Sequence, residues 1–461
     1  MFAPKGLGRR WALLIGGDAA VSMWAAYYAF GENGRIDFSS SSPEHYHLAA
    51  LSLTTIHLAL FYFQDLYEIT RRRTRAWVAS SVVTASAKVA VLVAIITFAI
   101  PGFDYGRRFY IVYMLSSSTG LLLWRVAVNR LIFDRLSIGV MAFGFAEYAP
   151  LLAEEAERLG QLGWRFLGFA SYADGANRSL IAGAQPPTIH QVSSIDDLTR
   201  RFNPNILVLL GDGAHAPSVR ELVKCRSRGI QVFDFETFYE LTTGKLPLPF
   251  VRESWLLYAP GFAGSHWQRL IERGLDIAAA LAIGLVTLPV SLTAAIAIKL
   301  DSGGPIFYSQ DRVGLDGAVF HIGKFRSMRQ DAERNSGAVW ASTEDPRVTR
   351  VGRVIRKLRV DELPQLLNVL RGDMSLVGPR PERPEIVARL SEEIAYYDYR
   401  HFVRPGLTGW AQVCYPYGAS VGDAREKLRY DLYYIKNWSL FFDLQIILQT
   451  VKVVIFGRGA R

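Results

Sequence analysis

The chain has 461 residues, of which 50% are hydrophobic, and it carries a formal charge of +10 at pH 7. A chain of this length is expected to form two or three domains, and the apolar fraction favours membrane segments beside soluble parts. Its two cysteines, Cys225 and Cys414, exclude a disulfide framework and fit a reducing compartment. The positive charge favours an anionic partner, such as lipid headgroups, a phosphorylated substrate or nucleic acid.

The first part of the chain contains four apolar segments, each with roughly the 20 residues needed to cross a bilayer. They are Trp11–Phe30, Leu48–Tyr67, Trp77–Ile100 and Phe109–Phe133. Lysine and arginine gather before the first segment, between the second and third, and at the end of the fourth. Because cytoplasmic loops carry the excess of basic residues, the N-terminus and everything after residue 136 are predicted to lie in the cytoplasm. We expect residues 1–136 to form a four-helix transmembrane bundle without a removed signal peptide.

Four polar residues interrupt these segments: Asp18, His57, Lys88 and Arg125. Ionisable groups at membrane depth either pair inside a bundle or extend toward the interface from near a helix end. The sequence leaves both interpretations open for each of the four.

Residues 137–250 alternate between strand and helix patterns. Apolar runs predict strands at 138–143, 165–170, 205–210 and 230–235, with helices after the first strand and at 218–228. This alternation predicts a parallel sheet and a Rossmann-like α/β domain. The glycine fingerprint after the first strand is degenerate, since Ala146 and Ala149 follow Gly144 where the second and third glycines belong. We therefore expect a structural or regulatory domain without a bound dinucleotide.

A fifth apolar stretch, Ile277–Ile298, has basic residues on both sides, including Arg273 before it and Lys299 after it. Such flanks oppose a crossing under the positive-inside rule, and Pro289 near the middle breaks the helix. We predict a re-entrant helix at about residues 269–300 that bends at Pro289 and returns to the same face. The alternative is a kinked span, which would place all later residues outside the cell.

The most informative segment is Asp361-Glu-Leu-Pro-Gln365, followed by a glycine- and proline-rich turn that carries Arg380. By itself the acidic pair is typical of a helix start, where carboxylates complement the helix dipole and proline is tolerated. The final stretch, Trp438–Phe456, has apolar residues at helical spacing. It fits either a helix on the membrane surface or a core helix.

Residues 264–461 combine these features with further motifs in a fixed order. The motifs are Arg273-Gly-Leu-Asp276, Asp301-Ser-Gly-Gly-Pro305, Gln310-Asp-Arg-Val-Gly314, Lys324-Phe-Arg-Ser-Met328, Asp361–Gln365, Asn368–Pro381, Arg404–Gln412 and Asp431–Asn437. Together they resemble the bacterial sugar transferase family, the polyprenyl-phosphate hexose-1-phosphate transferases or monotopic phosphoglycosyl transferases. The four spans and the Rossmann-like domain resemble the large-form, exopolysaccharide-type members.

The resemblance implies an α-rich monotopic catalytic domain and a two-step reaction at the cytoplasmic face of the bacterial inner membrane. Asp361 would attack a UDP-sugar, release UMP and pass the phosphosugar to polyprenyl (undecaprenyl) phosphate. Glu362 would help to position Mg²⁺, and Asp431 would line the same site. Candidate phosphate-binding residues are Lys324, Arg326, Arg380 and Arg404. Membrane lipids are expected partners, nucleic acid is not, and large-form relatives suggest a homodimer.

The residue chemistry supports this interpretation independently. A carboxylate is a competent phosphoryl acceptor, and the reacting anions need cationic neighbours. Mg²⁺ usually takes one or two carboxylates together with phosphate oxygens. One departure is Arg359-Val360, since many relatives have a small hydroxyl residue and Leu or Ile there; Arg359 reaches either the phosphate or solvent.

Two other functions fit parts of the sequence. An NAD-dependent nucleotide-sugar dehydratase or epimerase would use the middle domain, but the chain contains no Tyr-x-x-x-Lys sequence and its glycine fingerprint is degenerate. A non-enzymatic scaffold for polysaccharide export would leave the acidic pair and Arg380 without a role. Nucleic-acid binding explains the charge but not the four spans.

Overall fold

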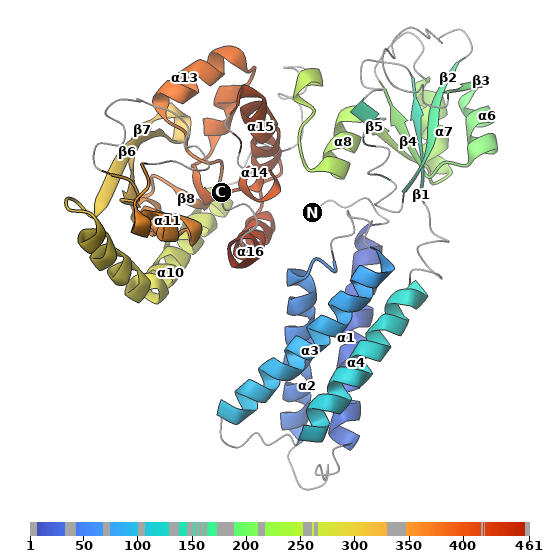
Figure 1. Cartoon of the computed structure of the whole chain (residues 1–461). Coiled ribbons are helices and arrows are strands. Elements are labelled where there is room, and N and C mark those ends of the chain that lie inside the picture. Colours follow the sequence, from blue (N-terminus) through green and yellow to red (C-terminus); the bar gives the residue numbers. More distant parts are fainter. Residues whose placement is uncertain are drawn as a thin grey trace. The chain divides into compact units, whose positions relative to one another are not determined.

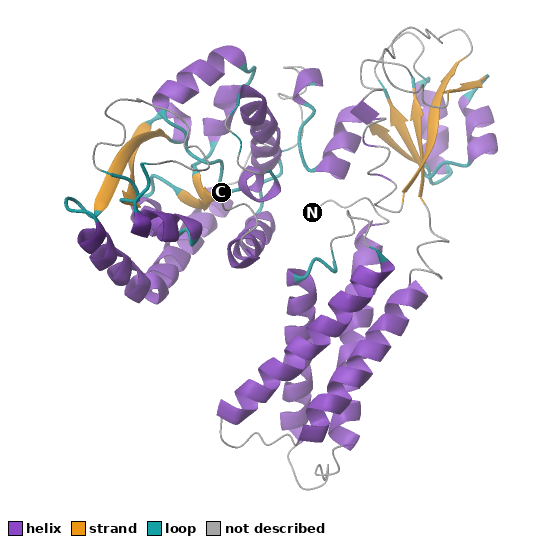
Figure 2. Ribbon diagram, in the orientation of Figure 1, coloured by secondary structure: helices purple, strands orange, loops and turns teal. Residues whose placement is uncertain are grey.

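The computed structural model describes most of the chain as two compact units, Phe2–Thr242 and Thr243–Arg461 (Figure 1). Each unit has hydrophobic clusters of its own. The described residues are 7–32, 43–67, 74–99, 107–128, 138–144, 151–152, 155, 159, 164–172, 189–210, 217–251, 261, 266–329, 347–415, 418 and 420–456. Helix predominates among them, and strands form one parallel sheet and two small ribbons (Figure 2).

Four long helices occupy the N-terminal part of the first unit: α1 (Leu7–Glu32), α2 (Pro43–Phe63), α3 (Arg75–Ala99) and α4 (Arg107–Val128). Helices α2, α3 and α4 contain stretches long and apolar enough to cross a membrane, at three of the four segments predicted to span it. Helix α1 also forms where predicted, but it is not among these stretches. Alanines of α1 pack closely against Phe109 and Tyr113 of α4, so small side chains allow the helices to approach.

Polar contacts between the helices stabilise the interior of this bundle. Asp18 accepts a 2.5 Å hydrogen bond from Arg125, and Arg125 also donates to the carbonyl of Leu66 at 2.9 Å. His57 lies 3.1 Å from the hydroxyl of Tyr113. These three polar residues are therefore bundle contacts.

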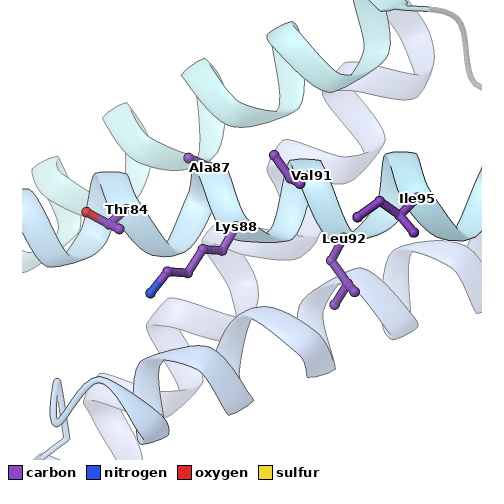
Figure 3. A pocket seen from close by; sticks show the side chains of 6 residues that line it. All are labelled: Thr84, Ala87, Lys88, Val91, Leu92 and Ile95. Carbon is purple, nitrogen blue, oxygen red and sulfur yellow. The ribbon is translucent and has the colours of Figure 1, made fainter. Parts of the chain in front are cut away.

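Lys88 differs from the other polar residues of the bundle because its side chain is exposed. It lines a shallow hollow on the outer surface of α3 together with small and apolar neighbours (Figure 3). They are Thr84, Ala87, Val91, Leu92 and Ile95.

The α/β part of the first unit is a five-stranded parallel sheet with the order β3-β2-β1-β4-β5. The strands are β1 (Ile138–Phe143), β2 (Trp164–Tyr172), β3 (Ile189–Val192), β4 (Ile206–Leu209) and β5 (Gln231–Asp234). The described helices of this part are α6 (Ile195–Phe202), α7 (Val219–Ser227) and α8 (Phe235–Thr243). This strand order is that of a Rossmann-type sheet, as predicted.

Four strands and α7 lie where the sequence predicted them, whereas β3, α6 and α8 were not predicted. Gly144 directly after β1 has a φ of +100°, and a Cβ there would lie 2.9 Å from the carbonyl oxygen of Leu210. Glycine is therefore required at this turn for reasons of backbone geometry alone. Ala146 and Ala149 lie outside the described residues, so the absence of a dinucleotide stays a prediction.

The second unit is rich in helix, as expected. Its helical elements are η4 (Leu248–Phe250), α10 (His266–Asp301), η5 (Leu315–Gly317), α11 (Arg350–Lys357), η6 (Val360–Gln365), α12 (Leu366–Arg371), α13 (Pro384–Glu393), η7 (Tyr397–Phe402), α14 (Trp410–Cys414), α15 (Val421–Lys436) and α16 (Leu440–Phe456). An antiparallel ribbon joins β6 (Phe307–Val313) to β7 (Val319–Phe325), and β8 (Ser375–Val377) pairs with β9 (Gly406–Thr408) in parallel. One buried cluster from α12, α13, α15 and α16 forms the core beneath these ribbons.

Helix α10 is 36 residues long and contains Pro289. A straight helix of this length would span about 54 Å, yet both of its ends pack on the same unit. Arg273 donates to the carbonyls of Val369 and Leu370, and Asp301 accepts from the backbone N–H of Val351. Figure 1 shows the helix bent into two arms, as a proline break requires.

The bend of α10 exposes apolar side chains, among them Leu285, Val286 and Leu292 at 73%, 77% and 58%. The helix also has the length and composition of a membrane span. Its bent form agrees with the predicted break, and its entry into a bilayer stays a prediction.

Helix α16 combines the two interpretations that its sequence left open. Phe442 and Ile446 are buried in the core, whereas Phe441, Leu444 and Val454 are exposed. One face therefore packs on the unit, and the other presents an apolar surface.

Candidate active site

The acidic pair lies in a tight 3₁₀ turn rather than in the first turn of an α-helix. Turn η6 begins after Arg359, whose φ of +57° is left-handed, and the regular helix α12 starts only at Leu366. A non-glycine residue in this conformation is held there by its surroundings. The turn packs against β7 and α10, which places the acidic pair beside Lys324 of β7.

Asp361 is a partly buried carboxylate, and its Oδ1 has no hydrogen-bond partner among the described residues. Burial and the negative charge of Glu362 raise its pKa to about 6, although Lys324, Arg356 and Arg359 oppose this. A buried acceptor without a partner is costly, so such an atom is a sign of a site that receives a ligand. Asp361 is the only group of the acidic pair with this property in the described structure.

Glu362 occupies a different electrostatic environment. Burial favours its neutral form, but the charges of Arg380, Lys324 and Arg359 outweigh burial and lower its pKa to about 2. Its Oε1 lies 2.8 Å from Nη2 of Arg380 and 3.7 Å from Nη1 of Arg359. Arg359 therefore lies beside Glu362 while its side chain stays partly exposed, and a contact with phosphate stays a prediction.

Lys324 completes the charged cluster from the neighbouring ribbon. Burial lowers its pKa to about 8, against the attraction of Glu362 and with the help of Arg380 and Arg312. The structure thus gathers two carboxylates with unequal pKa values and several cations around one turn. Paired groups whose environments separate their pKa values are typical of sites with divided chemical roles.

Arg380 reaches this cluster from a second loop. Its Nη1 lies 3.2 Å from Oε1 of Gln412, while its Nη2 contacts Glu362. The loop crosses the Arg404-Pro-Gly406 segment closely: a Cβ on Gly378 would lie 2.4 Å from the carbonyl oxygen of Arg404. Glycine at 378 therefore permits the approach that brings Arg380 to the acidic pair.

Comparison with known proteins identifies the family to which this part of the chain is similar. Residues 267–457 match the bacterial sugar transferase family. An exopolysaccharide production protein of Rhizobium leguminosarum is 43% identical over 187 residues, which cover 40% of this chain and 94% of that protein. The chain belongs to the bacterial sugar transferase family.

Other members of the family have more specific names. A UDP-glucose:undecaprenyl-phosphate glucose-1-phosphate transferase of Caulobacter vibrioides is 48% identical over 40% of this chain and 68% of that protein. A UDP-N-acetylgalactosamine-undecaprenyl-phosphate N-acetylgalactosaminephosphotransferase of Aeromonas hydrophila is 44% identical over 265 residues, or 57% of this chain and 61% of its own length. The chain thus spans less than two thirds of that relative.

Not every residue proposed for phosphate binding contacts the acidic pair of this sugar transferase. Arg326 is buried, and its Nη2 donates to the carbonyl and hydroxyl of Ser302, while Nε and Nη1 lack partners in the described structure. Nε of Arg404 donates to the carbonyl of Gly372 at the end of α12. Phosphate binding by Arg326 and by Arg404 stays a prediction.

Asp431 lies in the interior of the sugar transferase unit. It is 2% exposed, and its Oδ2 accepts a 2.9 Å hydrogen bond from Nη2 of Arg400. Arg400 donates in turn to the backbone carbonyl of Arg380. Asp431 is therefore connected to the acidic pair through two arginines.

The sequence did not assign roles to Gln412, Arg312 or Arg400. Gln412 lies in a motif that was recognised, and its contact with Arg380 follows from the fold. Arg312 and Arg400 hold backbone carbonyls of the Arg380 loop, and such contacts leave no sequence pattern. Only a structure reveals them.

The donor set of the acidic pair bears on whether the site can hold a metal. The described residues contain no group of three or more His, Cys, Asp or Glu side chains suited to a metal. Two adjacent carboxylates, one with an unpartnered buried oxygen, are nevertheless what Mg²⁺ uses when substrate phosphates supply the other ligands. The acidic pair therefore fits Mg²⁺ that arrives with a phosphorylated substrate.

Proposed function

We propose that this sugar transferase moves a sugar 1-phosphate from a UDP-sugar to polyprenyl (undecaprenyl) phosphate, starting an exopolysaccharide or another surface glycan. The single observation that carries the proposal is the Asp361 carboxylate, partly buried and with an unpartnered Oδ1 inside a cationic cluster. The names of the Caulobacter and Aeromonas relatives support the same class of donor and acceptor.

In the first step a carboxylate oxygen of Asp361 attacks the phosphorus that carries the sugar. The bond from this phosphorus to the bridging oxygen breaks, and UMP leaves with the bonding electrons. The product is a phosphosugar bound to Asp361 as an acyl phosphate. In the second step a phosphate oxygen of the polyprenyl phosphate attacks the same phosphorus and frees Asp361.

The surrounding charges suit this reaction. Asp361 is mostly ionised above its pKa of about 6, and therefore nucleophilic at neutral pH. Lys324 and Arg380 stand beside the acidic pair and neutralise the phosphate charge that accumulates during the transfer. When bound, Mg²⁺ supplies further neutralisation, with Glu362 as its protein ligand.

Membrane attachment brings the lipid-soluble polyprenyl phosphate to this site. We place the exposed apolar side chains at the bend of α10 and the exposed face of α16 in the inner leaflet of the bacterial inner membrane. The active site then faces the cytoplasm, where UDP-sugars are soluble.

The test uses the full-length protein in membranes or nanodiscs with a panel of radiolabelled UDP-sugars that includes UDP-glucose and UDP-N-acetylgalactosamine. We expect UMP release, label on the protein without acceptor, and its transfer when undecaprenyl phosphate is added. Asp361→Asn abolishes all three, whereas Glu385→Gln, an exposed carboxylate of α13, changes none. Undiminished UMP release by Asp361→Asn would refute the assignment of the nucleophile.

A further inference from the structure

The loop that carries Arg380 is held almost entirely through its carbonyl groups. Pro379 and Pro381 have no backbone N–H, so the segment offers few donors to its neighbours. Four consecutive carbonyls, those of residues 379 to 382, each accept a hydrogen bond of 2.9–3.0 Å. The donors are the N–H of Gly406, Nη2 of Arg400, Nη1 of Arg312 and the N–H of Val313, in that order. The direction of the Arg380 side chain is thus fixed by groups outside the loop.

Arg400 is the buried member of this set of donors. It is 6% exposed, and its Nη2 contacts both the carbonyl of Arg380 and Oδ2 of Asp431 at 2.9 Å. Its Nη1 donates to the hydroxyl of Tyr397 at 2.8 Å. A guanidinium stays charged in a protein, so at this depth it needs a counter-ion. Asp431 provides the negative charge.

Asp431 is well placed for this task because α15 is anchored in the core. Leu428 and Leu432 on the same helix are buried in the main hydrophobic cluster. The carboxylate also borders a small polar hollow that Lys427 and Glu382 line. The competing interpretation is therefore that Asp431 binds substrate directly in this hollow.

We infer that Asp431 and Arg400 are positioning residues, which hold the backbone carbonyl of Arg380 so that its guanidinium stays on Glu362. The chain of contacts runs from Asp431 to Arg400 at 2.9 Å, to the Arg380 carbonyl at 2.9 Å, and from Nη2 of Arg380 to Glu362 at 2.8 Å. Each contact is direct, and no substrate atom is required for it.

The arrangement has a consequence for charge at the acidic pair. Glu362 faces Arg380, Lys324 and Arg359, with Asp361 beside it. Arg380 is the strongest of the cations that lower the pKa of Glu362. A loosened Arg380 loop therefore withdraws from Glu362 the guanidinium that lies 2.8 Å from its Oε1.

The kinetic part of the test rests on the proposed function. We expect Asp431→Asn to lower kcat by about 10- to 100-fold, because small misplacements of a catalytic group have effects of this size. The KM for the UDP-sugar stays within about twofold, since no binding contact is removed. The matched control is Glu426→Gln, an ion-paired carboxylate of the same helix that contacts Lys245 and Arg429. It should leave kcat, KM and the pH profile unchanged.

A second variant separates positioning from folding. Breaking one side of a buried ion pair often unfolds a protein, whereas replacing both sides with apolar residues often does not. Arg400→Met with Asp431→Leu should therefore remain folded and still show the low kcat. In an Arg380→Gln background, Asp431→Asn should add less than about a threefold loss, since the two act through one contact.

Hydrogen–deuterium exchange provides a readout that needs no turnover. Peptides covering residues 375–382 and 404–409 should exchange faster in Asp431→Asn than in the wild type. In Glu426→Gln their exchange rates should equal those of the wild type. Unchanged exchange in these peptides, a raised KM with normal kcat, or full additivity with Arg380→Gln would each overturn the positioning role. Absence of UMP release from the wild type would instead refute the proposed function, and the exchange result would stand independently.

Discussion

Nη2 of Arg380 lies 2.8 Å from Oε1 of Glu362, although 18 residues separate the two in the sequence. The contact joins a proline-bounded loop to the turn that carries Asp361. It keeps Glu362 ionised despite its burial, since Arg380 is the strongest of the cations opposing desolvation. Burial raises the pKa of the neighbouring Asp361, and the permanent negative charge of Glu362 raises it further.

Removing the guanidinium should show how much the reaction depends on this contact. Arg380→Gln is expected to lower kcat/KM by about 100- to 1,000-fold, the usual effect of deleting one group that stabilises developing phosphate or oxyanion charge. Arg380→Lys should recover only part of this, because an ammonium does not bridge Glu362 and Gln412 as a guanidinium does. Steady-state UMP release measures both. Arg389→Gln, an exposed arginine of α13, is the control, and equal rates in all three variants would contradict the role.

The pH–rate profile of the first step should be bell-shaped. Below about pH 6 it falls because Asp361 becomes protonated and loses its nucleophilic form. Above about pH 8 it falls because Lys324 loses its positive charge. Glu362, with a pKa of about 2, stays ionised throughout. Rapid-quench measurement of UMP release between pH 5 and about pH 10 covers both limbs.

Lys324→Arg separates the two limbs of this profile. Arginine keeps its charge across the whole range, so the alkaline limb should flatten while the acid limb stays in place. An alkaline limb that persists in Lys324→Arg would show that another group titrates there.

The helices and strands predicted correctly are those whose own residues form a recognisable secondary-structure pattern. Strand β1 is a buried apolar run, and its bounds follow from the sequence to the residue. Strand β3, Ile-His-Gln-Val, is short and mixed, so nothing in its composition marks it as a strand. Helix α6 did carry a signal: Ser194 caps it by accepting from the N–H of Asp197. An N-cap serine marks a helix start, so the sequence itself contains a signal for α6.

The candidate active site shows the same division. The motifs that contain Asp361, Glu362, Lys324 and Arg380 were recognised, and the fold brings these four together. The supporting contacts were not predicted, because Arg400 binds a backbone carbonyl 20 residues away. The sequence does not distinguish Arg400 from the other arginines of this segment. Packing alone selects the one that is buried beside Asp431.

The bundle offers a test of buried charge. Asp18 and Arg125 have side-chain exposures of 0% and 9%, so breaking this pair leaves one charge uncompensated. Asp18→Asn is expected to destabilise the bundle by about 3–5 kcal/mol, and Asp18→Leu with Arg125→Met should recover most of this. The control is Glu32→Gln, which breaks the exposed contact with Arg108 and should cost less than about 1 kcal/mol. Denaturant unfolding in detergent measures the stability of all three variants. Equal losses of stability in Asp18→Asn and Glu32→Gln would show that the buried pair contributes no more than the exposed one.

The bend of α10 predicts that both ends of this helix are reached from the same side of the membrane. Trp267 is 74% exposed, and Gly303 has no atom within 4 Å of an added Cβ. Trp267→Cys and Gly303→Cys, each in a Cys414→Ser background, should therefore react with a membrane-impermeant maleimide only from the cytoplasmic side.

Pro289 should be needed for that topology. Pro289→Ala restores the missing backbone donor and lets the 36-residue helix straighten. A fraction of Gly303→Cys should then become reactive from the periplasmic side, with a matching loss of UMP release, while Trp267→Cys stays cytoplasmic. Labelling of the two cysteines from opposite sides in the unaltered helix would show that α10 crosses the membrane. That result would separate the active site from cytoplasmic UDP-sugars and overturn the membrane arrangement proposed for this enzyme.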